Sequence, residues 1–159
     1  MNALVKPYMP TPVKILILLL GYITLGLGKS LVQLRGNYGP YFEEFSDLGL
    51  AITLLEANLA IVICLNCYIA FELVSRSRGG LNYIIAGFLL ASIFRILANW
   101  IIPTLTEIPD EFYYSTRTLI VKSCFTMLFS SGWIMYFINN SKAQEIYGPK
   151  LPEGIISKI

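Results

Sequence analysis

Four long runs of apolar residues, separated by short polar segments, dominate the chain. They lie at about 13–34, 48–74, 81–102 and 118–138. Each run reaches about the 20 residues that an α-helix needs to cross the hydrocarbon layer of a membrane. The second run has Glu56 and Glu72 as its only charges and lacks the polar stripe of a water-facing helix. The pattern therefore predicts an all-α integral membrane protein, folded as a four-helix bundle.

The first run is the weakest of the four and resembles a signal peptide. Lys6 and Lys14 precede its apolar core, and Gly26 and Gly28 form a small-x-small pattern at the end of that core. Alanine, the usual residue at such cleavage sites, is absent from this pattern. We therefore expect a retained first helix.

Positive charges flank the runs unevenly. Seven lie in the N-terminal segment, the second loop and the C-terminal tail, namely Lys6, Lys14, Arg76, Arg78, Lys142, Lys150 and Lys158, against Lys29, Arg35 and Arg117 on the opposite side. Cytoplasmic segments carry such an excess, so we expect both termini to be cytoplasmic. Residues 1–147 should form a single four-span membrane domain, followed by a C-terminal tail at 148–159. Prolines near the end favour a short surface segment after Ser141.

The composition narrows the possible functions. Hydrophobic residues make up 55% of the chain and charged residues 14%, whereas about a quarter of a soluble domain is charged. The net charge of +2 is too weak and scattered for a nucleic-acid surface. The chain has no histidine, which excludes bis-histidine haem, the common zinc sites and an imidazole base. We predict no cofactor and no metal.

The three cysteines all lie inside apolar runs, so no disulfide framework is expected. Cys64 and Cys67 are one helical turn apart, but no histidine or nearby carboxylate completes a metal site. We interpret them, like Cys124, as small packing residues. Small residues such as Gly87 should also allow close helix packing.

Ionisable residues inside the runs are the most informative feature. Glu56, Arg95 and Lys122 each lie within a predicted span, where a charge is costly and usually has a partner. At 1.5 Å per residue, Glu56 and Arg95 both lie roughly 11–12 Å from the outer ends of their spans. We therefore expect these two residues to pair, with Lys122 above them.

Two interpretations of these charges stay open. In the first, Glu56 and Arg95 neutralise one another and fix helix register, while Lys122 extends to the interface. In the second, Glu56, Arg95, Asn99 and Lys122 line a net positive pocket for an anionic lipid headgroup or a small anion.

Aromatic residues near the inner end of the fourth run have two possible roles. Trp133, Tyr136 and Phe137 are typical of an interfacial belt, and a stacking platform for a ring-bearing ligand is the alternative.

Catalytic patterns are weak. Lys122 and Ser123 are adjacent, so on one helix their side chains point about 100° apart and do not form a nucleophile and base pair. The sequence has no Gly-rich phosphate loop, no HExxH and no GxSxG. A Ser–Lys dyad across helices, such as Lys122 with Ser92, is the enzymatic alternative.

The segment 120–147 resembles the end of the YdgK-like family of bacterial four-span membrane proteins, a domain of unknown function. In that family a tryptophan precedes a Tyr-Phe pair, a serine, a basic residue and a final aromatic residue. Trp133, Tyr136, Phe137, Lys142 and Tyr147 match this pattern, whereas Met135 replaces a frequent proline and Asn140 the serine. The basic loop 75–80 is also similar. The resemblance implies a four-span protein of the bacterial inner membrane and supplies no catalytic residues.

The leading hypothesis is a non-enzymatic multi-pass protein of the cell membrane that acts as an accessory or assembly subunit. Its partners would be membrane lipids and other membrane protein subunits, with no nucleic acid. The alternative is a small lipid- or anion-binding carrier that uses the Glu56, Arg95 and Lys122 pocket. A membrane enzyme that acts on a lipid is the third possibility.

Overall fold

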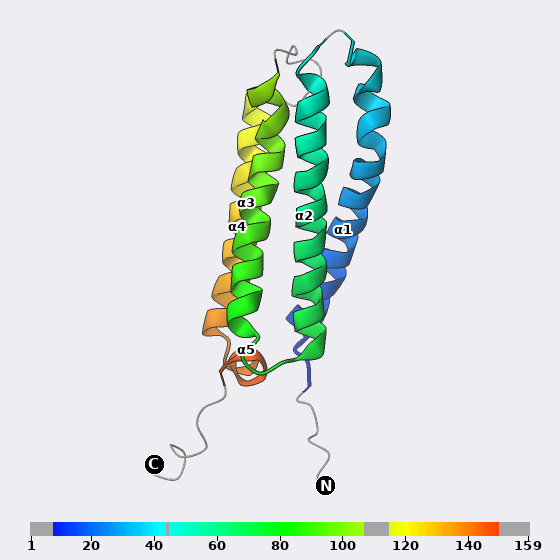
Figure 1. The fold of residues 1–159 in the computed structure, drawn as a ribbon. Coiled ribbons are helices and arrows are strands. Elements are labelled where there is room, and N and C mark those ends of the chain that lie inside the picture. Colours follow the sequence, from blue (N-terminus) through cyan, green and yellow to red (C-terminus); the bar gives the residue numbers. More distant parts are fainter. Residues whose placement is uncertain (1–7, 44, 107–114, 150–159) are drawn as a thin grey trace, which may run out of the picture.

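The protein is all-α over the residues that the computed structural model describes, which are 8–43, 45–106 and 115–149. Its long helices are α1 (Thr11–Tyr38), α2 (Leu48–Ser75), α3 (Leu81–Leu105) and α4 (Thr116–Asn139). A 3-10 turn, η1 (Gly39–Tyr41), follows α1, and the short helix α5 (Ser141–Tyr147) lies under the bundle (Figure 1). Four helices are long and apolar enough to cross a membrane. The predicted fold class is therefore confirmed, and the architecture is that of a multi-pass membrane protein.

The first helix is longer than its apolar run predicts. It continues past Gly26 and Gly28 to Tyr38, so that Arg35 lies in its last turn. A cation is favourable at this position because the last turn of a helix carries partial negative charge. Arg35, which the sequence placed at the edge of a loop, therefore belongs to a membrane-spanning helix.

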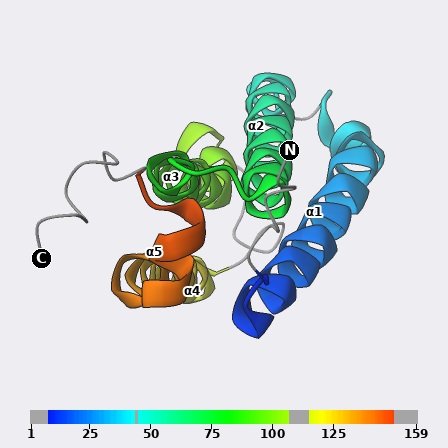
Figure 2. The ribbon, with the colours of Figure 1, turned by 90° about the horizontal axis from the view of Figure 1, so that it is seen from below.

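The helices pack in chain order around α2 and α3. α2 packs against both α1 and α3, and α3 packs against α4, whereas α1 and α4 make few contacts with each other over the described residues. Seen from below, α1 is inclined to the other helices and diverges from α4 (Figure 2). The side between α1 and α4 therefore has few backbone contacts, and side chains such as Leu16 and Leu20 of α1 and Phe137 of α4 fill its lower part.

Close packing of α2 and α3 depends on a glycine. A Cβ atom built on Gly87 would lie 2.7 Å from Cγ1 of Ile69, closer than real Cβ contacts. The prediction that Gly87 is a helix-packing position is confirmed.

Two apolar cores hold the bundle together. The lower core contains Val13, Leu16, Leu20, Ile69, Leu73, Ile84, Phe88 and Phe137, and the upper core contains Leu34, Leu48, Ile52, Leu55, Leu59 and Ile102. The outer surface is apolar as well, since Leu18 is 74% and Val32 83% exposed. Such a surface suits contact with lipid chains.

Helix α5 closes the lower end of the bundle. The Asn140 side chain accepts a hydrogen bond from the Ala143 N–H at 3.1 Å and caps the helix. The Tyr147 hydroxyl donates to the Leu73 carbonyl at 2.7 Å, and its ring packs edge-on against Phe137. Burial raises the pKa of Tyr147 to about 12.

Several expectations at this end and on the bundle surface are wrong. The chain after Ser141 begins with a helix whose Ala143, Ile146 and Tyr147 are buried, rather than with a surface segment. Phe137 is fully buried and cannot belong to an interfacial belt. The cysteines are exposed rather than packed inside the bundle, at Cys64, Cys67 and Cys124.

Candidate functional site

The intramembrane carboxylate pairs with an arginine from α1. Arg35 donates from Nε to Oε1 and from Nη2 to Oε2 of Glu56, both at 2.8 Å. This two-point geometry joins α1 to α2 and occupies both carboxylate oxygens. The expected pairing of Glu56 with Arg95 is therefore wrong, because the earlier helix supplies the cation.

Arg95 lies instead beside a small cavity inside the bundle. The cavity, of about 20 Å³, is lined by all four long helices, through Leu20, Asn66, Phe88, Ala91, Ser92, Arg95, Thr126, Phe129 and Ser130. This volume accommodates about one water-sized group. Arg95 is ten residues from the end of α3 at Leu105, which places its backbone roughly 15 Å from that end. The charge is thus near the middle of the span.

The hydroxyl groups around this cavity already have hydrogen bonds. Ser92 hydrogen bonds with Ser130 and lies 2.7 Å from the Phe88 carbonyl oxygen. Thr126 donates to the Lys122 carbonyl at 3.0 Å. These hydrogen bonds stay within and between α3 and α4. None of the hydroxyl groups accepts a hydrogen bond from Arg95.

Two donors at the cavity have no acceptor in the described part of the chain. Asn66 is 4% exposed, and its Nδ2 has no hydrogen-bond partner there. No described residue forms an ion pair or hydrogen bond with the half-buried Arg95. A buried donor without an acceptor is costly, as is an unpaired charge in a membrane. The pair therefore suits an acceptor oxygen, and the cavity has room for about one such atom.

The cavity lies between side chains of α1 and α4. Leu20 of α1 and Phe129 of α4 belong to its lining, although the backbones of these two helices make few contacts over the described residues. Phe129 also lines an apolar hollow between α1 and α4. A group that displaces these side chains would reach Arg95 beside Phe129.

The predicted site residues are only partly brought together. Arg95 lines the cavity, whereas Glu56 is held by Arg35, and neither Asn99 nor Lys122 belongs to the lining. Lys122 and Asn99 are half-buried on their own helices. Ser92 is bonded to Phe88 and Ser130, so it is not placed in a dyad with Lys122.

Sequence reasoning missed the groups that surround Arg95. Asn66 lies in the most apolar run and carries no charge, so nothing in the pattern distinguished it from a tolerated polar residue. Its position among large aliphatic residues was the available signal, because a buried amide needs a partner.

Comparisons with known proteins found no match to this chain. No family model matches the chain, and no curated protein or solved structure is significantly similar to it. Over the described residues no group of three or more Cys, Asp or Glu side chains is placed to hold a metal ion.

Proposed function

We propose that the protein is a non-enzymatic membrane protein that acts as an accessory or assembly subunit, and that Arg95 pairs with an acidic side chain of a partner's membrane-spanning helix. The observation that carries this proposal is the arginine in the middle of α3, next to the unpartnered amide of Asn66. Both groups donate hydrogen bonds, and a carboxylate accepts them.

The depth of Arg95 favours a protein partner. Its backbone lies roughly 15 Å from the end of α3, whereas the hydrocarbon layer is about 30 Å thick and lipid phosphates lie outside that layer. A carboxylate carried by a second transmembrane helix reaches this depth without deforming the bilayer. It would approach the arginine between α1 and α4, where Leu20 and Phe129 line the cavity.

The test compares the assembly formed by the wild-type chain with that of Arg95→Met and Arg95→Lys. Membranes are extracted in mild detergent, and the native mass of each complex is measured against the 17.8 kDa of the chain. We expect a larger complex for the wild type, its loss in Arg95→Met and its partial retention in Arg95→Lys. Arg117→Gln, an exposed charge at the start of α4, is the matched control and should leave the complex intact. An unchanged complex in Arg95→Met would contradict the proposal.

A small-anion carrier is the second candidate, because the same two donors suit a small anion. In that case Arg95→Met abolishes retention of a soluble anion such as chloride or formate by the purified chain, without any change in the assembly.

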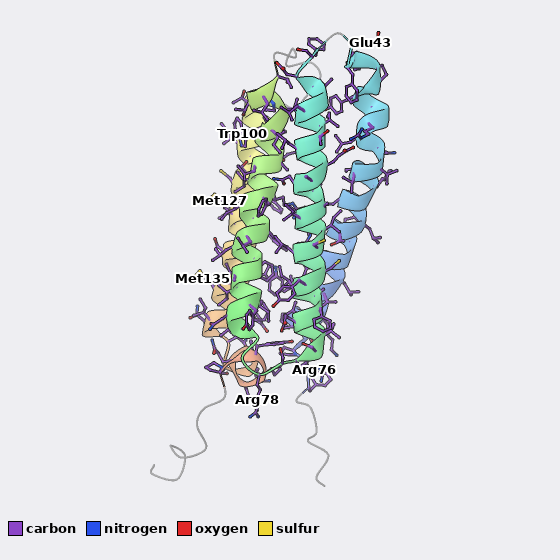
Figure 3. The ribbon with its side chains drawn as sticks, viewed as in Figure 1. Glu43, Arg76, Arg78, Trp100, Met127 and Met135 are labelled. Carbon is purple, nitrogen blue, oxygen red and sulfur yellow. The ribbon has the colours of Figure 1, made fainter. Side chains whose placement is uncertain are left out.

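The proposed location is the bacterial inner membrane, with both termini in the cytoplasm. The beginning of α1 and the helix α5 lie at the same end of the bundle as Arg76 and Arg78, whereas Glu43 lies at the opposite end (Figure 3). Positive charge favours the cytoplasmic side, and the YdgK-like resemblance suggests the inner membrane. A reporter active only in the cytoplasm should give signal when fused to the C-terminus and none when inserted in the 107–114 segment.

A further inference from the structure

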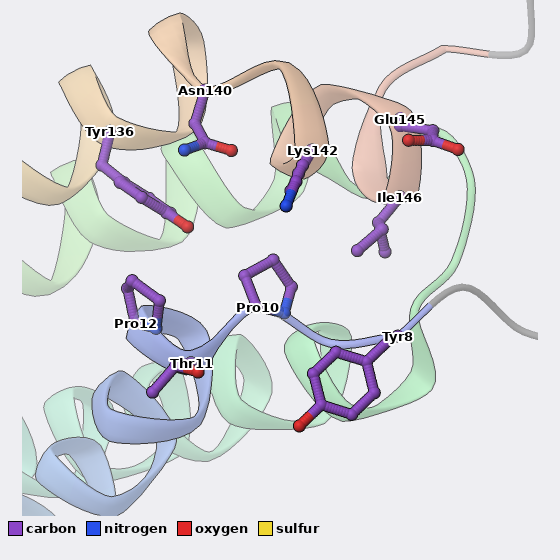
Figure 4. A pocket seen from close by; sticks show the side chains of 9 residues that line it. All are labelled: Tyr8, Pro10, Thr11, Pro12, Tyr136, Asn140, Lys142, Glu145 and Ile146. Atoms are coloured by element: carbon purple, nitrogen blue, oxygen red, sulfur yellow. The ribbon is translucent and has the colours of Figure 1, made fainter.

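Two connected hollows lie between the beginning of α1 and the end of α4. The first, here called the interface pocket, has a volume of about 560 Å³ and is lined by polar residues of α4 and α5 and by the start of α1 (Figure 4). The second, here called the apolar groove, has a volume of about 430 Å³ and contains Leu128, Phe129, Gly132 and Trp133. Pro12 and Tyr136 line both hollows, so the two form one continuous surface.

Three hydrogen-bond donors gather in the interface pocket. The exposed ammonium group of Lys142 has no partner in the described part of the chain. The Oδ1 atom of Asn140 accepts from Ala143, which leaves its Nδ2 as the available donor. The enclosed Tyr136 hydroxyl has no hydrogen-bond partner among the described residues. One cation and two neutral donors match the acceptor oxygens of a phosphate group.

The polar side chains of the interface pocket follow one another along its length. Figure 4 shows Tyr136, Asn140 and Lys142 on the side facing Pro10 and Pro12, with the Glu145 carboxylate at the far end. Glu145 lines the same pocket three residues after Lys142 on α5, so its negative charge offsets part of the attraction of Lys142 for a phosphate.

The apolar groove extends from this pocket toward the middle of the membrane. Leu128 lies eleven residues before the end of α4 at Asn139, a distance of roughly 16 Å along the helix. The groove has an open floor at Gly132, where a Cβ atom would meet no other atom within 4 Å. Trp133 and Phe129 supply apolar walls. A hydrocarbon chain fits this shape and polarity.

We propose that a membrane phospholipid occupies the two hollows, with its phosphate at Lys142, Asn140 and Tyr136 and one acyl chain along Gly132. The change from polar to apolar lining follows the direction from the membrane surface to its interior, which is the polarity of a lipid. A partner helix would instead need a continuous apolar lining. The residues proposed to hold the phosphate do not line the cavity at Arg95, whereas Phe129 lines both that cavity and the apolar groove. The lipid proposal does not depend on the subunit proposal.

The test measures binding of dioleoyl phosphatidylglycerol to the purified full chain by native mass spectrometry. Lys142→Gln removes the phosphate-binding charge, and Gly132→Leu fills the groove. Each should weaken lipid binding about tenfold, as expected for loss of a charged hydrogen bond or an equivalent contact. Lys29→Gln and Gly26→Leu, exposed positions of α1 that line neither hollow, are the matched controls and should bind like the wild type.

The outcomes separate a lipid from a free phosphate. Dioleoylglycerol, which lacks the phosphate, should bind at least about tenfold more weakly, and glycerol phosphate should not compete. Unchanged binding in Lys142→Gln and Gly132→Leu overturns the proposal, as does competition by glycerol phosphate at the affinity of the lipid. If Gly132→Leu lowers the helix content seen by circular dichroism, Leu128→Trp provides the second block of the groove, and unchanged lipid binding in that variant overturns the proposal.

Discussion

Replacing Arg95 with methionine should stabilise the isolated chain, whereas most substitutions of buried residues destabilise proteins. An arginine at the centre of a membrane helix costs about 2.5–3.5 kcal/mol on insertion scales. Arg95 is half-buried beside polar groups, and Glu56 is occupied by Arg35. Part of that cost is retained when the chain unfolds within the micelle, so Arg95→Met should raise the free energy of unfolding by less than the full amount, on the order of 1 kcal/mol.

The assay is reversible unfolding of the purified chain in mixed micelles, followed by circular dichroism. Arg95→Lys keeps the charge and is the control, for which we expect no gain in stability. A buried charge that already has a partner behaves differently, because its loss costs about 3–5 kcal/mol. A comparable loss of stability in Arg95→Met would refute the view that this arginine is unpaired in the isolated chain.

Three further predictions concern the bundle itself. Arg35→Gln and Glu56→Gln should be non-additive in a double-mutant cycle of unfolding, whereas Glu56→Gln and Arg95→Gln should be additive. Additivity of the first pair would disprove its ion pair. Gly87→Ala should lower the free energy of unfolding by about 1–3 kcal/mol, because the added Cβ atom would be too close to Ile69 of α2. An unchanged unfolding midpoint would show that α2 moves to accommodate the added atom. Tyr147→Phe should cost about 1 kcal/mol at pH 8 through the lost hydrogen bond. The pKa of Tyr147 is raised from 10 to about 12 in the folded protein. The contribution of its neutral hydroxyl to the free energy of unfolding is therefore complete below pH 10 and is lost as the pH rises toward 12. At pH 11 the wild type should therefore have lost on the order of 1 kcal/mol relative to Tyr147→Phe, and equal pH profiles would contradict that burial effect.

The sequence predicted the four spans because long apolar runs are a strong signal, but it did not predict which charges meet. Depth along a helix follows from residue number, whereas the direction of a side chain around the helix depends on packing with its neighbours. Glu56 and Arg95 share a similar depth, yet Glu56 faces α1, where Arg35 provides the closer cation. Arg35 was missed because the predicted first run ends at position 34, so that Arg35 was counted among the charges that flank the run rather than among those within it.

The short helix α5 was missed for a different reason. Prolines after Tyr147 drew attention to the end of the chain, although Ala143, Ile146 and Tyr147 have the three- and four-residue spacing of an apolar helical face. That spacing was the available signal. The burial of Tyr147 against α2 could not follow from it, because the contact spans 74 residues of sequence.

Photo-cross-linking at position 129 tests most directly whether a partner's acidic residue reaches Arg95. Phe129 lines both the cavity and the apolar groove, so a photoreactive phenylalanine analogue there reports on the molecules that contact either one. In native membranes we expect lipid cross-links from the groove and, in addition, a cross-linked peptide that contains Asp or Glu within an apolar span, in yields that fall with Arg95→Met and recover with Arg95→Lys. The absence of any protein cross-link, or protein cross-links in yields that do not depend on Arg95, would contradict the account.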